Sequence, residues 1–286
     1  CVSESYEPGS TFKPVTVASA LEEGVVKDGD TYVCKGFETV ADYKLKCHVF
    51  STIGSHGSLT VEQALMNSCN PYMIHLALEM GNSRFAYYQS LFGFGKITGI
   101  DLPGETTGIV YGDRMTTIDA ACNSFGQTIN VNMMQMMAAY CSIINGGMLY
   151  QPHIVKRIES ANGEVVKEYK ANLVRQTITA STSKLLRRYL KNTVEEGTAK
   201  KAGVTGYSVA GKTGTAQKGD RKDNKWIISF IGHAPAENPK FAIYVVIDEP
   251  YGTTGTSGSS ADVLTLTHNI LEKLLPYMNV YKDASD

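Results

Sequence analysis

The spacing of hydrophobic residues along this 286-residue chain changes about two-thirds of the way from its start. In the first part, apolar residues recur three and four positions apart, which places them on one face of a helix. These runs predict helices at 10–21, from Thr60 toward Ser68, and at 84–91, 117–124, 133–144 and 181–195. The segment 25–58 is polar and punctuated by glycine, and therefore predicts irregular structure.

The last third instead carries short β-branched and aromatic runs separated by Gly, Asn and Pro. They predict strands at 207–210, 226–232 and 241–247, followed by an amphipathic helix at 263–275. Helices followed by adjacent strands and a final helix predict an α+β fold, with helices covering an antiparallel sheet. The stretch 251–260 is rich in Gly, Ser and Thr, and we expect it to be mobile.

Composition narrows the classes of function. Apolar residues make up 43% and charged residues 19% of the chain, as in ordinary soluble globular proteins. The 27 basic residues balance 28 acidic ones, which argues against nucleic acid as a partner. No apolar run approaches the roughly 20 residues that span a bilayer. The chain opens on Cys1 without a signal peptide, and we expect it to be a fragment.

The first of three short motifs pairs Ser10 with Lys13 at the start of the first predicted helix. Positions three apart lie on one helix face, so the amine can reach the hydroxyl. A serine becomes a good nucleophile when a base takes its proton, and a desolvated lysine can be neutral enough to do so. Taken alone, such a pair is more often an ordinary surface pair.

The second motif is Ser68-Cys69-Asn70, at the predicted end of the helix that begins at Thr60, with Gln63 in capping-box position. On a turn, Ser68 and Asn70 can face one cleft, where Ser68 would relay a proton and Asn70 would hold a substrate amide. Alternation along the turn would point Cys69 away from that cleft. Taken alone, the segment is an ordinary helix C-terminal turn.

The third motif, Lys212-Thr213-Gly214-Thr215, follows the strand predicted at 207–210. Gly214 leaves a strand face without a side chain, so an extended substrate can lie along the backbone and pair with it. Lys212 and Thr213 can present a cation and a hydroxyl to a substrate carboxylate. The alternative structure for this segment is a hairpin turn.

The ordered set of motifs is far more specific than any single one. S-x-x-K, S-x-N and K-T-G in this order resemble the signature of serine β-lactamases and penicillin-binding proteins. The likeness extends through 6–14, 124–127, 210–217 and 226–235. The chain resembles the transpeptidase domain of class B penicillin-binding proteins, most closely the elongation and sporulation types, over nearly its whole length.

The resemblance implies a penicillin-binding, β-lactamase-like serine transpeptidase domain at 1–286. Its helical lobe would span roughly 25–145, and its sheet-bearing lobe roughly 146–286 together with the catalytic helix at 1–24. The implied activity is that of a peptidoglycan D,D-transpeptidase. A stem peptide ending in D-Ala-D-Ala acylates the serine, and an amine of a neighbouring stem resolves the acyl-enzyme. β-Lactams would acylate the same serine, and the chemistry needs no cofactor.

Residue roles follow from the positions in the motifs. The implied catalytic residues are Ser10 as nucleophile, Lys13 as its general base, and Ser68 and Asn70. The implied substrate-binding residues are Lys212, Thr213, Gly214 and Thr215. The backbone N–H groups of Ser10 and Thr215 would form the oxyanion hole, whose donors typically contribute about 3–4 kcal/mol.

The resemblance also implies a place on the extracytoplasmic face of the cell membrane, an anchoring N-terminal helix that this sequence lacks, and a glycan-polymerase partner in the membrane. Three alternatives remain open. A carboxypeptidase or β-lactamase would use water in place of the amine. A receptor domain would signal after a single acylation, and a catalytically inactive scaffold would only bind partners.

Four residues form a candidate metal site beside the second motif: Cys34, Cys47, His56 and Cys69. Three thiolates and an imidazole are a usual structural zinc set and leave no open position for a catalytic water. A metal on Cys69 would support the catalytic turn, and some elongation-type members of the resembled family carry zinc nearby. A disulfide between Cys34 and Cys47 or free thiols are the alternatives. Reserve ligands are His48, Asp30 and Asp42.

Overall fold

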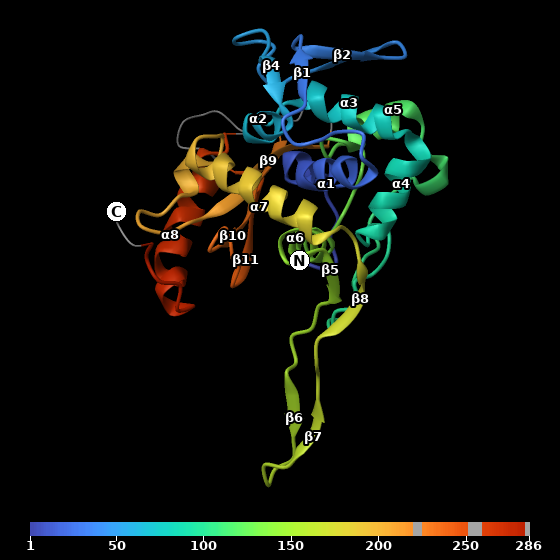
Figure 1. Cartoon of the computed structure of the whole chain (residues 1–286). Helices are drawn as coiled ribbons and strands as arrows, with labels where there is room; N and C mark the ends of the chain where they lie inside the picture. The colour runs from blue at the N-terminus through green and yellow to red at the C-terminus, as the bar shows by residue number, and fades with distance from the viewer. Residues whose placement is uncertain (220–224, 251–258, 284–286) are drawn as a thin grey trace.

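The computed structural model describes residues 1–219, 225–250 and 259–283 (Figure 1). Helices and antiparallel strands confirm the predicted α+β class. The helices are η1 (Gly9–Phe12), α1 (Lys13–Glu23), α2 (Val61–Met66), α3 (Asn70–Met80), α4 (Asn82–Leu91), η2 (Gly112–Arg114), α5 (Thr117–Asn123), α6 (Met133–Ile144), α7 (Ala180–Glu195), η3 (Lys200–Ala202) and α8 (Ala261–Tyr277). Residues 251–258, within the stretch expected to be mobile, lie outside the described residues.

The strands belong to one larger sheet and several two-stranded ones. They are β1 (Thr31–Cys34), β2 (Phe37–Val40), β3 (Tyr43–Lys46), β4 (Gly57–Thr60), β5 (Met148–Gln151), β6 (Arg157–Glu159), β7 (Val165–Glu168), β8 (Asn172–Gln176), β9 (Ala210–Lys218), β10 (Lys225–Ala234) and β11 (Phe241–Asp248). The larger sheet has the antiparallel order β11-β10-β9, and β10 pairs with both neighbours. α8 packs against β10 and β11, whereas η1 and α7 pack against β9 (Figure 1). Helices therefore cover this sheet, as predicted.

The strand predicted at 207–210 is wrong. β9 begins at Ala210, so the third motif lies inside a strand rather than after one, and the hairpin-turn alternative is wrong as well. The glycines of β9 do not form a turn; they allow neighbouring atoms to pack closely against the strand. A Cβ atom on Gly211 would lie 2.3 Å from the Phe230 ring, and one on Gly214 would lie 2.4 Å from Ser229 Oγ. Glycine in a strand often marks such a close approach.

The predicted helices agree with the structure to within about two residues at most ends. The helix predicted at 10–21 begins as η1 and continues as α1, which ends at Gly24 with a left-handed φ of 77°. Such a C-terminal glycine is a common helix stop. The predicted capping box is present, because Thr60 and Gln63 exchange side-chain-to-backbone hydrogen bonds at the start of α2.

The second motif follows the end of the helix that begins at Thr60, as predicted, but it leads directly into a second helix. α2 ends at Met66, Ser68 adopts a positive φ of 54°, and Asn70 is already the first residue of α3. Cys69 is the N-cap residue of α3. The motif is therefore a tight turn between two helices, and this turn fixes the directions of its three side chains.

Two regions contain strands that the sequence did not predict. The segment 25–58, predicted to be irregular, holds β1 paired with β4 and β2 paired with β3. Farther along, β5 pairs with β8 and β6 with β7, and Figure 1 shows them as an arm that projects from the body. Most side chains on these short strands are exposed, so no apolar alternation marks them.

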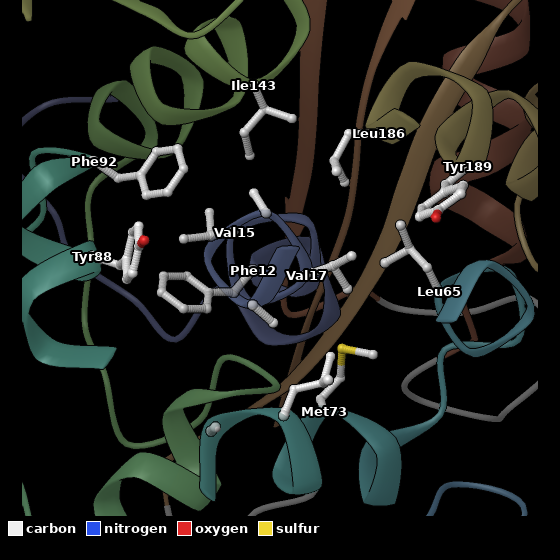
Figure 2. Close-up of a cluster of buried hydrophobic side chains, with 14 of the residues drawn as sticks. Phe12, Val15, Val17, Leu65, Met73, Tyr88, Phe92, Ile143, Leu186 and Tyr189 are labelled. Atoms are coloured by element: carbon white, nitrogen blue, oxygen red, sulfur yellow. The ribbon is translucent and has the colours of Figure 1, made fainter. Parts of the chain in front are cut away.

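The helix that follows Ser10 is the centre of the largest hydrophobic core. Figure 2 shows Phe12, Val15 and Val17 surrounded by side chains from other elements, including Leu65, Met73, Tyr88, Phe92, Ile143, Leu186 and Tyr189. Val15 and Val17 are at most 2% exposed. Full burial of each such side chain contributes about 1.5–3 kcal/mol. Ser10 thus stands at the start of one of the most firmly packed helices of the molecule.

Candidate active site

One cavity of about 400 Å³ collects residues from all three motifs. Its lining includes Ser10 from η1, Ser68 and Asn70 from the α2–α3 turn, and Thr213 and Thr215 from β9. Segments more than 200 residues apart in sequence thus meet at one place. The structure brings together the predicted catalytic residues and the hydroxyls of the predicted substrate-binding residues.

Lys13 lies beneath this cavity and is fully buried. Its Nζ donates to the Ser68 carbonyl at 2.6 Å, to Ser68 Oγ at 2.9 Å and to Asn70 Oδ1 at 2.6 Å. Burial lowers the pKa of Lys13 to about 8, although the Cys47 and Cys69 thiols oppose the shift. A lysine of this pKa is partly neutral near pH 7, so it can accept a proton.

The Lys13 amine, which we expected to be able to reach the Ser10 hydroxyl, bonds to the second motif in this structure. Within the described residues, the Ser10 hydroxyl makes no side-chain hydrogen bond, and all three Lys13 contacts go to the second motif. Ser10 and Ser68 nevertheless share the cavity wall. Catalytic hydrogen bonds are often long before substrate binds and shorten in the complex.

A second buried lysine approaches the same hydroxyl. Lys212 Nζ lies 3.0 Å from Ser68 Oγ and 3.2 Å from the Thr213 carbonyl oxygen. Burial, and next the positive charge of Lys13, lower the pKa of Lys212 well below its ordinary value. Because Ser68 Oγ lies between two amines, a proton can pass from one side of the cavity to the other through this hydroxyl.

The turn of the second motif points its side chains as the alternation predicted. Ser68 and Asn70 line the cavity, whereas Cys69 is fully buried and does not. Asn70 is held on both ends of its amide: Oδ1 accepts from Lys13, and Nδ2 donates to the Lys46 carbonyl at 3.3 Å. The carboxamide is therefore fixed in direction at the edge of the cavity.

Behind this turn, the four predicted metal ligands form one group. The ligand atoms of Cys34, Cys47, His56 and Cys69 all lie within 4.8 Å of one another, and the three cysteines are at most 3% exposed. His56 Nδ1 is 3.9 Å from Cys34 Sγ and 3.5 Å from Cys47 Sγ. Tetrahedral zinc with bonds of about 2.0–2.3 Å requires ligand separations near 3.5 Å. The donor set and its spacing fit zinc.

A metal needs deprotonated thiols, and of the two cysteines of this group with a shifted pKa one moves toward that form and the other away from it. Hydrogen bonding from Cys69, and also from His56, lowers the pKa of Cys47, although burial opposes the shift. The pKa of Cys69 is raised because it donates to Cys47 and is buried. All six cysteines of the chain are free, so Cys34 and Cys47 form no disulfide in this structure.

The three reserve ligands are not part of the metal-ligand group, and one of them, His48, lies in the active-site cavity instead. His48, Asp30 and Asp42 are absent from the four-residue cluster. The His48 ring lines the active-site cavity instead, and its Nε2 lies 2.9 Å from the Asn67 carbonyl oxygen. This imidazole is part of the cavity wall, next to the second motif.

Several other cavity residues were not assigned from the sequence. Thr198 and Ser260 line the wall, as do Trp226 and the pair Phe125 and Gln127. Phe125, Gln127 and Trp226 lie in segments that carry the family resemblance, so this resemblance could have pointed to them. Thr198 reaches the site because its N–H and hydroxyl bind the Met66 carbonyl at 3.2 Å. No local pattern marks such a contact.

Comparison with known proteins decides the family. A family model described as penicillin binding protein transpeptidase domain matches residues 1–272. The chain belongs to this family. It is 41% identical over 285 residues to stage V sporulation protein D of Bacillus subtilis. This match covers 98% of the present chain and 43% of the Bacillus protein. It is 32% identical over 289 residues to peptidoglycan D,D-transpeptidase FtsI of Escherichia coli K12, with 99% and 46% covered.

Solved structures agree with this assignment. Penicillin binding protein 3 of Mycobacterium tuberculosis, complexed with ampicillin, superimposes with a TM-score of 0.88 at 29% sequence identity. The match covers 99% of this chain and 65% of that one. The predicted resemblance and the predicted penicillin-binding protein transpeptidase fold are thereby confirmed. The chain spans less than half the length of the two curated relatives named above.

Proposed function

We propose that this chain is the catalytic domain of a peptidoglycan D,D-transpeptidase with Ser10 as the nucleophile. The observation that carries the proposal is that Ser10 and Ser68 line one cavity, while the buried amines of Lys13 and Lys212 both bond to Ser68 Oγ. A relative 32% identical is named peptidoglycan D,D-transpeptidase, and a solved relative is complexed with ampicillin. The substrate would be a stem peptide ending in D-Ala-D-Ala, and β-lactams would be covalent inhibitors.

The proposed first step is acylation. Neutral Lys13 takes the Ser10 proton, and Ser10 Oγ attacks the carbonyl carbon of the penultimate D-Ala. The backbone N–H groups of Ser10 and Thr215 hold the resulting oxyanion, a contribution of about 3–4 kcal/mol. The C–N bond then breaks, and the leaving D-Ala nitrogen receives its proton through Ser68. An amine of a second stem peptide attacks the ester, forms the cross-link and frees Ser10.

We assign the binding of the donor peptide to β9. This strand forms one edge of the sheet, so an extended peptide can pair with its backbone. Thr213 and Thr215 line the cavity and can donate to the terminal carboxylate. Lys212 is fully buried, and its amine bonds to Ser68 Oγ and to the Thr213 carbonyl oxygen. It therefore holds the second motif and β9 together. Gly214 lets the strand approach Thr11 and Ser229 closely.

We also propose how this domain acts in the cell. Residues 1–286 would be one transpeptidase domain with the helical and sheet-bearing lobes described above. A longer protein would hold it at the extracytoplasmic face of the cell membrane through an N-terminal helix, beside a glycan polymerase. Among the residues that the structure describes, no helix combines the length and apolar character needed to cross a bilayer.

Mass spectrometry after exposure to penicillin tests the proposed activity. We expect one covalent adduct on the peptide that contains Ser10, and we expect it to persist long after it has formed. Rapid loss of the adduct would favour the β-lactamase alternative, because water would then replace the amine. An adduct on a different residue, or none, would contradict the proposed function.

We further propose that Cys34, Cys47, His56 and Cys69 hold a structural zinc ion. Their spacing, burial and ligand types support this. When bound, the metal would supply no chemistry to the reaction, because four protein ligands leave no open position. Cys69 lies between Ser68 and Asn70, so its attachment to the other three ligands would hold the catalytic turn in place.

Metal analysis of purified protein tests the zinc site. We expect about one zinc per chain by elemental mass spectrometry, as in other closed four-ligand sites. Cys69→Ser should lose most of this zinc and unfold at a lower temperature. Cys141→Ser is the control, because Cys141 is a free cysteine outside the group and should leave the zinc content unchanged. Metal-free wild-type protein with the same melting temperature as zinc-loaded protein would rule the site out.

A further inference from the structure

We propose that Tyr244 is a positioning residue for acylation. Its hydroxyl links β11 to the turn that carries Ser10 and so sets the position of this turn against β9. The inference rests on the proposed role of Ser10 as nucleophile. Tyr244 does not line the active-site cavity, so it would act only through the residues that it holds.

A chain of hydroxyl groups runs through Tyr244 in one direction. Tyr6 donates to the Tyr244 hydroxyl at 2.6 Å, and this hydroxyl lies 3.3 Å from Thr11 Oγ1. Thr11 donates its own proton to the Pro8 carbonyl oxygen at 2.7 Å. Since Thr11 has only one proton to give, Tyr244 is the donor in the middle link. The chain therefore ends on the backbone two residues before Ser10.

The chain passes directly behind the third motif. A Cβ atom built on Gly214 would lie 2.4 Å from Ser229 Oγ, 2.8 Å from Thr11 Cγ2 and 3.0 Å from the Pro8 carbonyl oxygen. Thr11 and Pro8, the last two members of this series of hydrogen bonds, thus pack against the β9 backbone next to Thr215. This hydroxyl chain controls how η1 sits on β9.

That placement matters because the two proposed oxyanion donors come from different elements. Ser10 belongs to η1 and Thr215 to β9, and both N–H groups must lie about 2.7–3.1 Å from the developing oxyanion. A displacement of about 1 Å in a catalytic arrangement can cost 100-fold in rate. Linked hydrogen bonds also polarise and strengthen one another. Removing the central hydroxyl would release η1 from β11.

The protein offers a control for the loss of one hydrogen-bonded tyrosine hydroxyl away from the active site. Tyr140 on α6 is 1% exposed, and its hydroxyl lies 2.8 Å from His233 Nδ1. Neither residue lines the active-site cavity. Tyr140→Phe should therefore destabilise the fold in the same way as Tyr244→Phe, by leaving a buried polar partner unpaired, without moving the turn that carries Ser10.

The experiment compares these variants in the whole chain with a fluorescent penicillin, followed by stopped-flow kinetics and thermal unfolding. We expect Tyr244→Phe to lower the acylation rate constant about tenfold while changing the non-covalent dissociation constant less than about twofold. Tyr140→Phe should keep the wild-type rate constant at a similar loss of melting temperature. Thr11→Ser, which keeps both hydrogen bonds, should react at close to the wild-type rate.

Tyr6→Phe provides a second test in case Tyr244→Phe does not fold. It removes only the outer donor, and we expect about a threefold loss of acylation rate. A wild-type rate constant in Tyr244→Phe, or in Tyr6→Phe where the first cannot be measured, would overturn the inference. So would equal losses of rate in Tyr244→Phe and Tyr140→Phe. A wild-type protein that penicillin does not acylate would instead overturn the proposed function itself.

Discussion

Replacement of Lys13 by methionine is expected to slow the acylation of Ser10 by roughly 100- to 10,000-fold, the usual contribution of a general base. Methionine fills a similar volume in a buried position but cannot accept a proton. Ser68 and Asn70 would also lose the amine that they share. Stopped-flow acylation by a β-lactam measures the loss, and thermal unfolding shows whether the variant is folded.

The pH dependence of the wild-type rate tests the same role without a mutation. Burial lowers the pKa of Lys13 from 10.5 to about 8. Below this value the amine is protonated and cannot accept the Ser10 proton, so the rate should rise with pH and level off above about 8. At pH 7 the lowered pKa increases the neutral fraction roughly 300-fold. A rate that is flat or falls between pH 6 and 9 would contradict the assignment.

Two companion variants separate the possible roles of the amines. Lys13→Arg keeps the positive charge but stays protonated, so it should react as slowly as Lys13→Met. A fast Lys13→Arg enzyme would show that only the charge is needed. Lys212→Met removes the second amine on Ser68 Oγ, and we expect a smaller loss because Lys13 keeps its contact. A larger loss in Lys212→Met would transfer the role of base to Lys212.

The helices that sequence predicted best are those with both an apolar face and a cap. α6 coincides with its predicted range, 133–144, and its N-cap residue Asn132 forms a capping box with Gln135. α2 begins at the predicted box of Thr60 and Gln63. Local interactions of this kind are specified within a few residues. β10 and β11 were predicted because β-branched and aromatic residues dominate them.

Elements shaped by distant contacts were not predictable in this way. β9 was misplaced because glycines at 211 and 214 resemble turn residues, although Phe230 and Ser229 are what exclude a side chain there. Gly214 faces residues of η1 that are some 200 positions away in sequence. Strands β3, β6, β7 and β8 were missed because solvent, and not a core, faces most of their side chains.

In the candidate site, too, the sequence predicted which residues take part but not the contacts that tertiary packing creates. The motifs identified the residues that meet in the cavity, but they could not show which atoms pair. Lys13 binds the turn of the second motif, 55 residues away, instead of Ser10. Ser68 has a positive φ of 54° and lies in the turn between α2 and α3, which both contribute side chains to the core. Tertiary packing therefore decides the geometry of the proposed proton transfer.

A large loss of stability from a single added methyl group is expected at Gly126, which packs against the residue before Ser10. Its φ of 81° lies in the left-handed region, and a Cβ atom there would be 2.0 Å from the Gly9 carbonyl oxygen and 2.7 Å from the Gly9 nitrogen. These are backbone atoms, which cannot rotate away. Gly9 also donates its N–H to the Gly126 carbonyl at 2.9 Å, one residue before Ser10.

Gly126→Ala should therefore lower the free energy of unfolding by about 4 kcal/mol or more, because steric overlap adds to backbone strain. Gly24→Ala is the matched control, since Gly24 has a φ of 77° and no described atom within 4 Å of an added Cβ. It carries only the left-handed strain of about 1–2 kcal/mol. Urea unfolding of both variants measures the difference. Equal losses would mean that the turn carrying Ser10 can move away from Gly126, in which case its position is not fixed by this contact.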